Sequence, residues 1–275
     1  MSVPFCIAVQ RKSQRSRTSS PFDQHAASAA IGLAAQTTQK RRNAMKRIVV
    51  IAIVLGLAML AVPSALAQWV LPPDSVVYGR TYSEWSAEWW QWAFSIPVAT
   101  HPLFDKGNCS VGQSGPVWFL GGSFVSNTDV RSCTVPAGKM LFFPILNGED
   151  SNVEESFNNG CSNPTFGSTI VGLRKCATGG QNGLKVHATI DGFSVPNIAS
   201  KFRFQSPAFS FTIPDDNWLK ATTGNPYAAG TYLSVGDGYY LMLAPLWPGK
   251  HVIHFYGSAP SGFTLDITYN LTVGK

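Results

Sequence analysis

Two glutamates four residues apart, Glu84 and Glu88, stand in the run SEWSAEWWQW (83–92), beside four of the chain's eight tryptophans. On a helix this spacing puts their Cβ atoms about 5–6 Å apart, close to the carboxyl separation of a retaining glycosidase pair. Such a pair could act as acid and base, so one hypothesis is an extracellular polysaccharide hydrolase or lyase. Glu84 also lies three residues after Thr81, however, and that spacing is typical of a helix-capping box.

A second group of residues has the chemistry of a sugar-binding site. The stretch IPDDNWLK brings Asp215 and Asp216 next to Trp218, and Trp247 stands in the turn PLWPG. Carboxylates accept hydrogen bonds from hydroxyl groups, and an indole offers an apolar face to a sugar ring. We therefore expect a ligand-binding site at Asp215, Asp216, Trp218 and Trp247. The alternative is that Trp218 folds back onto the edge of a sheet.

Asp150, Asn152 and Glu154 offer side-chain oxygens at alternate positions of an acidic segment, a pattern similar to part of a calcium-binding loop. The segment lacks the glycine and the distant bidentate glutamate of an EF-hand. A structural calcium ion is one hypothesis for this segment, and a solvated acidic loop is the other. HVIH (251–254) predicts no metal site, because residues i and i+3 of a strand point to opposite faces. We expect no other cofactor.

The N-terminal part of the chain carries the pattern of a secretory signal peptide. Residues 45–67 hold a basic start, a long apolar run and Ala-Leu-Ala (65–67), with small residues at the outer positions of a cleavage site. We expect cleavage after Ala67 and a secreted or periplasmic location; an uncleaved membrane anchor is the alternative. Residues 1–44 have no fold pattern and are predicted to be a non-native or disordered extension. The remainder, 68–275, is predicted to be a single exported domain.

The charge of the chain argues against a nucleic-acid partner. The net charge is +6, but residues 1–67 contain nine of the 21 Lys and Arg residues and one of the 15 Asp and Glu residues. The mature chain keeps 12 basic and 14 acidic residues, a net charge of −2. It has no basic cluster of the kind that a nucleic-acid surface needs. Membrane contact is expected only through the signal peptide.

The mature domain keeps four cysteines, an even number that suits an oxidising compartment: Cys109, Cys133, Cys161 and Cys176. Three pairings exist. We favour the sequential one, 109–133 with 161–176, in which each bond closes a loop of roughly 15 to 25 residues. Zinc is the alternative, but the chain has no CxxC motif and no histidine at ligand spacing.

Short apolar or alternating segments, separated by Gly, Pro and Asp-Gly turns, predict a mainly β domain after residue 115. In the last segment one face carries only apolar residues: Phe263, Leu265, Ile267, Tyr269, Leu271 and Val273. Turns are predicted at Asp191-Gly192, Asp237-Gly238 and Pro248-Gly249. The predicted architecture is an antiparallel β-sandwich similar to a jelly roll.

Two helices are predicted beside these strands. Between Thr81 and Pro97, large apolar residues repeat at spacings of 3, 4, 3 and 4: Tyr82, Trp85, Trp89, Trp92 and Ile96. A helix that is apolar over more than half its circumference is normally buried, so we expect it to lie across or plug the sandwich. The long polar excursion 147–183 is predicted to hold a short helix near 167–176.

Four stretches resemble a group of exported bacterial proteins of unknown function: YGRTYSEWSAEWWQWAFSIP, SGPVWFLGG, CTVPAGKMLFFPILN and DGYYLMLAPLWPGKHVIHF. The resemblance covers nearly all of the mature region and implies a bacterial, exported, single-domain protein. It implies no activity, so no catalytic residue is carried over.

Three functions remain open from the sequence. The leading hypothesis is a non-enzymatic module that binds a glycan or another cell-envelope component through loops at one end of the sandwich. The second is the polysaccharide hydrolase or lyase that uses carboxylates as acid and base. The third is an envelope structural protein that docks a partner through its tryptophan-rich helix.

Overall fold

The structure is a computed structural model that describes residues 69–104, 108–124, 127–157 and 169–274, together with Lys40 and Arg42. The chain divides into two compact units, Met1–Val62 and Pro63–Lys275, and every element discussed below belongs to the second. The predicted signal peptide (45–67) lies outside the described residues. Within those residues, no helix is long and apolar enough to span a membrane.

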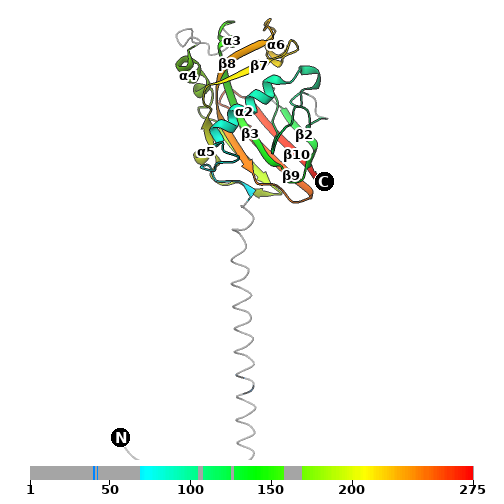
Figure 1. Cartoon of the computed structure of the whole chain (residues 1–275). Coiled ribbons are helices and arrows are strands. Elements are labelled where there is room, and N and C mark those ends of the chain that lie inside the picture. Colours follow the sequence, from blue (N-terminus) through cyan, green and yellow to red (C-terminus); the bar gives the residue numbers. More distant parts are fainter. Residues whose placement is uncertain are drawn as a thin grey trace, which may run out of the picture. The chain divides into compact units, whose positions relative to one another are not determined.

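The second unit is mainly β, and its described residues form ten strands in two sheets (Figure 1). Sheet I has the strand order β1-β3-β8-β6, and β7 also pairs with β8. Its strands are β1 (Val117–Phe119), β3 (Met140–Ser151), β6 (Arg203–Gln205), β7 (Phe209–Ile213) and β8 (Gly230–Leu243). Sheet II has the order β2-β10-β9-β4-β5. Its strands are β2 (Asn127–Pro136), β4 (Lys185–Ile190), β5 (Phe193–Ser194), β9 (Gly249–Ser258) and β10 (Thr264–Gly274).

Both sheets are mixed, which corrects the prediction of purely antiparallel pairing. β1 runs parallel to β3, and β2 runs parallel to β10, whereas the other pairs are antiparallel. Alternation of apolar and polar residues indicates which face of a strand is buried, but it carries no information on the direction of the neighbouring strand. The strand orders given above are open rather than closed into a barrel, and the jelly-roll connectivity stays a prediction.

The two sheets pack against each other through apolar side chains. Phe143 of β3 stacks on Phe255 of β9, with the ring centroids 5.3 Å apart. The alternation predicted for the last strand is confirmed, because the inward side chains of β10 are all buried: Leu265, Ile267, Tyr269, Leu271 and Val273. A core therefore lies between sheet I and sheet II.

The tryptophan-rich segment forms helix α2 (Tyr82–Ser95), as predicted. Thr81 and Glu84 make the capping box, in which the Thr81 N–H donates to Glu84 Oε2 at 2.7 Å. The helix packs against β6, β7 and β8 of sheet I, and its four tryptophans are all buried: Trp85, Trp89, Trp90 and Trp92. The protein's own sheet therefore covers the helix.

Only one of the three predicted turns has the predicted form. Asp191 and Gly192 join β4 to β5 with φ angles of 50° and 82°, as a two-residue hairpin turn requires. Pro248 and Gly249 instead follow the crossing from β8 in sheet I to β9 in sheet II. These two strands are consecutive in the chain but are not paired with each other.

Asp237-Gly238 is not a turn, because β8 continues through both residues. Asp237 is buried, and its two carboxylate oxygens accept hydrogen bonds from the Arg203 guanidinium at 2.9 and 3.1 Å. A Cβ atom at Gly238 would lie 2.6 Å from the Asn147 Cα. Asp237 therefore makes an ion pair between β8 and β6, and Gly238 allows close packing between β8 and β3. The dipeptide Asp-Gly alone does not distinguish these roles from a turn.

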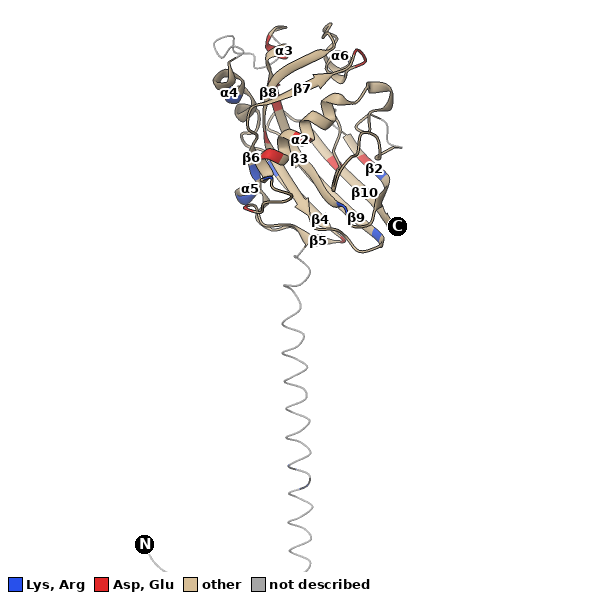
Figure 2. Cartoon of the chain, in the orientation of Figure 1, with Lys and Arg blue, Asp and Glu red and all other residues tan. Residues whose placement is uncertain are grey.

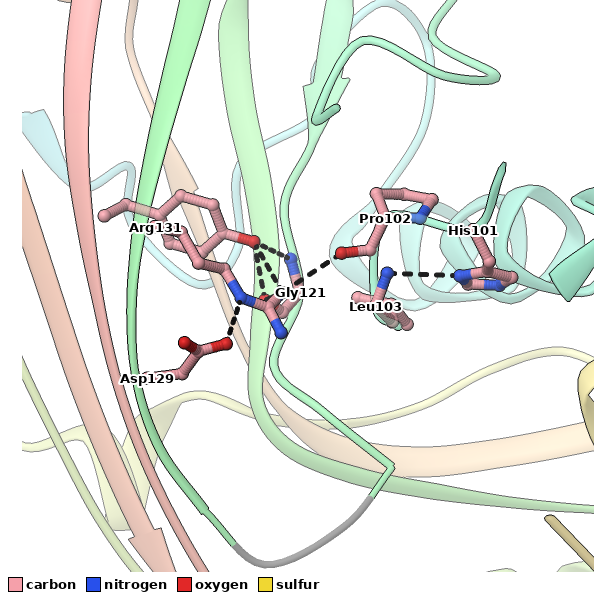
Figure 3. A network of polar contacts seen from close by, with 7 residues as sticks. His101, Pro102, Leu103, Gly121, Asp129 and Arg131 are labelled. Carbon is pink, nitrogen blue, oxygen red and sulfur yellow. Dashed lines mark hydrogen bonds and ion pairs between the residues drawn. The ribbon is translucent and has the colours of Figure 1, made fainter. Parts of the chain in front are cut away.

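A buried polar network ties the loop after α2 to sheet II (Figure 3). Arg131 Nε of β2 lies 3.0 Å from Asp129 Oδ2. Arg131 Nη1 also donates to the carbonyl oxygens of Pro102 and Gly121 and to the Tyr269 hydroxyl. A buried guanidinium needs this degree of pairing, because an uncompensated buried charge is costly.

His101, next to this network, is fully buried. Its Nε2 lies 2.8 Å from the Ala93 carbonyl oxygen, and its Nδ1 accepts the Leu103 N–H at 3.2 Å. A carbonyl only accepts and an N–H only donates, so the ring is neutral with its hydrogen on Nε2. Burial lowers the pKa of His101 to about 4.

The helix predicted near 167–176 is confirmed as α4 (Ile170–Gly180), which begins after the N-cap residue Thr169. The one-turn helices were not predicted, because so short an element shows no periodicity: η3 (Val98–Thr100), α3 (Asn152–Glu155), α5 (Ile198–Lys201) and α6 (Trp218–Thr223).

The disulfide Cys109–Cys133 is confirmed. Cys176 is disulfide-bonded as well, but Cys161 lies outside the described residues. The pairing of Cys161 with Cys176 therefore stays a prediction.

Candidate functional site

Trp247 is the most exposed large apolar side chain of the described residues, with 74% of its surface accessible. It stands between β8 and β9, where the chain passes from sheet I to sheet II. The His251 ring holds this segment, with Nε2 2.8 Å from the Trp247 carbonyl oxygen and Nδ1 2.7 Å from Asp191 Oδ2. The backbone at Trp247 is thus anchored while its indole ring faces solvent.

Close to this segment, a groove of about 390 Å³ crosses the outer face of sheet II. Alternate residues of a strand lie on the same face, so the floor is built from the outward residues of three neighbouring strands. Ser132, Asn270 and Val252 form one row, and Thr134, Thr272 and Lys250 form the next. Each row is about 10 Å long, because neighbouring strands lie about 4.8 Å apart.

Residues 108–110 line the edge of the groove beside β2, and the Cys109–Cys133 disulfide fixes them to that strand. Asn108 Oδ1 accepts hydrogen bonds from the Ser110 N–H at 3.2 Å and from the Ser110 hydroxyl at 2.6 Å. The lining of the groove is therefore mostly hydroxyl and amide groups, with one ammonium group at Lys250 and no carboxylate. Such groups suit a ligand rich in hydroxyls.

The other predicted sugar-binding residues lie around α6. Trp218 is the first residue of this helix; it is buried and stacks on Phe124 with centroids 4.2 Å apart. Its ring is part of the core and is not presented to a ligand. Asp216 Oδ2 accepts the Ala99 N–H at 3.0 Å, while Asp215 is exposed.

The structure does not bring Trp247 together with Asp215 and Asp216. Ile213, two residues before Asp215, pairs with Gly230 at the first residue of β8. Trp247 instead follows the last residue of β8. A strand of this length spans about 40 Å, so the two parts of the predicted ligand site lie at opposite ends of β8.

Glu84 and Glu88 both have partners near the start of α2. Hydrogen bonds from the backbone and side chain of Thr81 lower the pKa of Glu84. Glu88 Oε1 lies 3.1 Å from Arg80 Nε. A general acid that works near neutral pH needs a raised pKa, whereas the shift of Glu84 has the opposite sign. These contacts support the start of the helix.

Four carboxyl groups gather where β3 ends and α3 begins: Glu149, Asp150, Glu154 and Glu155. Acidic residues are drawn in red at α3 in Figure 2. Glu149 Oε2 accepts a hydrogen bond from the Ser234 hydroxyl at 2.6 Å, and Glu154 Oε2 accepts one from the Ser151 hydroxyl at 2.6 Å. Burial, followed by the negative charge of Glu154, raises the pKa of Glu149 well above its usual value. The direction of this shift favours the protonated form of Glu149 beside Glu154.

Asp150 is the most enclosed member of this acidic cluster. Its side chain is 1% exposed, and neither carboxylate oxygen has a hydrogen-bond partner. The Ser151 N–H and the Glu155 carboxyl lie close by, but their geometry is not that of a hydrogen bond. Burial and then the negative charges of Glu154 and Glu155 raise the pKa of Asp150 to about 7.

The cluster differs from the predicted calcium ligands Asp150, Asn152 and Glu154. Asn152 Oδ1 is engaged elsewhere, because it accepts the Leu233 N–H at 2.9 Å. Glu155 takes its place beside Asp150: their carboxylate oxygens and Cys176 Sγ all lie within 4.8 Å of one another. The sulfur belongs to a disulfide and is no thiolate ligand, so the two carboxylates are the donors that this group offers to a metal ion.

The sequence did not indicate an apolar pocket of about 320 Å³ between residues 69–73, β5 and α5. Phe193 is exposed at this pocket, and the Trp69 ring meets the His251 ring edge-on at 6.2 Å. Single aromatic residues in short segments gave no periodic signal that could have revealed it.

Comparison with protein-family models, with curated proteins and with solved structures found no match to this chain.

Proposed function

We propose that this protein is an exported, non-enzymatic β-sandwich module that binds a glycan of the cell envelope along the outer face of sheet II. The observation that carries the proposal is Trp247. Six of the eight tryptophans are buried, yet this one is 74% exposed, on an anchored backbone near a polar groove. Leaving so large an apolar ring in water is unfavourable unless a ligand covers it.

The groove supplies the polar half of such a site. Ser132, Thr134, Asn270 and Thr272 provide hydroxyl and amide groups across two strands, and these groups both donate and accept hydrogen bonds. Lys250, whose ammonium donates to Thr272 Oγ1 at 2.6 Å, adds positive charge at the edge. The proposed ligand is therefore a neutral or anionic polysaccharide that stacks on Trp247.

The two other hypotheses have less support. The tryptophans of α2 face the protein's own sheet, so they offer no ring surface to a docking partner. Glu84 and Glu88 are engaged by Thr81 and Arg80, which gives both residues a role in the helix.

The test is affinity electrophoresis of the mature protein in gels that contain bacterial envelope polysaccharides, neutral and anionic. For the polysaccharide that retards the parent most, Trp247→Ala should raise the dissociation constant about tenfold, since a lost ring contact is worth about 1–1.5 kcal/mol. Trp247→Phe should retain part of the affinity.

Tyr78→Ala is the matched control, because Tyr78 is also an exposed ring but lies just before α2, the helix that packs on sheet I. It should bind like the parent. The proposal fails if no polysaccharide retards the parent, or if Trp247→Ala and Tyr78→Ala bind equally well.

A further inference from the structure

The acidic cluster at the β3–α3 junction gathers four carboxyl groups in one partly enclosed volume. Glu149 and Glu154 have serine hydroxyls as partners, whereas the two oxygens of Asp150 have none. Among the residues that the structure describes, no Lys, Arg or His forms an ion pair with Glu149, Asp150 or Glu154. Buried charges are normally paired or coordinate a metal.

Two arginines of neighbouring elements are committed elsewhere. Arg203 pairs with Asp237 at 2.9 Å. Arg174 Nη1 donates to the Gly236 carbonyl oxygen at 3.5 Å. Neither guanidinium forms an ion pair with Asp150, and a bound cation would supply the charge that this buried carboxylate lacks.

We propose that Asp150 and Glu155 bind a calcium ion at the junction of β3 and α3. Their carboxylate oxygens lie within 4.8 Å of each other. A calcium ion has oxygen ligands at 2.3–2.6 Å, so one ion between the two groups contacts both. Glu149 and Glu154 are held by their serine partners and are not ligands.

Calcium fits these ligands better than other metals. All the ligand atoms are carboxylate oxygens, since the nearby Cys176 sulfur is in a disulfide, and this excludes the thiolate or imidazole sets that zinc prefers. Magnesium gives up its water reluctantly and demands octahedral geometry, whereas Asp150 is 1% exposed. Two carboxylates provide up to four of the six to eight oxygens of a calcium ion, and water provides the rest.

The site is independent of the proposed glycan groove. Asp150 lies on β3 of sheet I, whereas the groove crosses β2, β9 and β10 of sheet II. Loss of calcium binding and loss of glycan binding can therefore be measured separately.

The experiment compares thermal unfolding of the mature protein in EDTA, in 10 mM CaCl₂ and in 10 mM MgCl₂. With a millimolar dissociation constant, as in extracellular modules, calcium should raise the Tm by about 3–6 °C. Asp150→Asn keeps the shape of the side chain and removes its charge. This variant should lose the calcium shift and, in EDTA, should melt at or above the parent's temperature, because an uncompensated charge is gone.

Glu88→Gln is the control, because Glu88 lies on α2 outside the cluster, and it should keep the full shift. Equilibrium dialysis with radioactive calcium gives a second measurement that does not depend on melting: the parent should bind about one ion per chain and Glu155→Gln should bind at least tenfold more weakly. The proposal is overturned if calcium leaves the parent's Tm unchanged, if magnesium gives an equal shift, or if Asp150→Asn responds like the parent.

Discussion

His101 should make the stability of this domain fall as the pH falls. The buried ring is neutral, and burial lowers its pKa to about 4, compared with about 6.5 for an exposed histidine. Between these two values the unfolded chain binds a proton that the folded chain does not. The neutral ring's contribution to the free energy of unfolding is therefore fully present above about pH 6.5, and it is lost as the pH falls toward 4.

The size of the loss follows from the two pKa values. At 1.36 kcal/mol per pKa unit, the full loss is about 3 kcal/mol, and about 2.5 kcal/mol of it appears between pH 7.5 and 4.5. The acidic cluster acts in the opposite direction, because the pKa of Asp150 and that of Glu149 are raised and the folded chain binds those protons more tightly. The pH dependence of the parent alone is therefore a sum of opposing effects.

The contribution of His101 can be isolated by subtraction. His101→Gln keeps a donor and an acceptor but cannot titrate, so it should cost some stability at pH 7.5 through imperfect hydrogen bonds to Ala93 and Leu103. Urea unfolding of parent and variant at pH 7.5, 6.5, 5.5 and 4.5 gives the difference in free energy. The parent's advantage should shrink by about 2.5 kcal/mol over this range. A difference that changes by less than about 1 kcal/mol would refute the buried neutral ring.

The remaining predictions concern packing and the disulfide. Gly238→Ala should destabilise the domain by about 2 kcal/mol or more, because its Cβ would lie 2.6 Å from the Asn147 Cα and 2.8 Å from the Leu146 carbonyl oxygen. Gly180→Ala in α4 meets no atom within 4 Å and should be neutral or stabilising by up to about 1 kcal/mol; equal urea midpoints for the two variants would contradict this. The double change Cys109→Ser and Cys133→Ser removes a bond with a sequence separation of 24 and should cost about 3 kcal/mol. It should also weaken polysaccharide retardation, because residues 108–110 at the edge of the groove lose their anchor; unchanged retardation would mean that this edge does not contact the ligand.

The features that the sequence predicted well are those fixed by local periodicity. α2 was predicted from its capping box and its 3-4-3-4 spacing, and the alternation of β10 appears as alternating burial. Both patterns depend only on which face of one element is apolar. Strand direction depends on partners far away in the chain, and nothing in β2 alone indicates that it runs parallel to β10.

Composition was a weaker guide where a residue has two physical uses. Asp-Gly at 191–192 forms a hairpin turn, while Asp-Gly at 237–238 lies inside β8. Similarly, Trp218 and Trp247 both stand in short segments between strands, but α6 packs Trp218 into the core and the anchored segment before β9 exposes Trp247. The tertiary partners that decide these cases, Arg203 and Phe124 among them, cannot be recognised from local sequence.

The arrangement of the layers limits where a ligand could lie across strands. α2 covers one face of sheet I and sheet II packs on its other face, so β3 and β8 are buried along most of their length on both sides. This explains the apolar runs MLFFPIL of β3 and YYLML of β8. β2 and β10 instead alternate, because sheet II packs against sheet I on its inner side only. Among the described strands, the outer face of sheet II is therefore a broad sheet surface open to solvent, and this suits the proposed polymer ligand, which spans several strands.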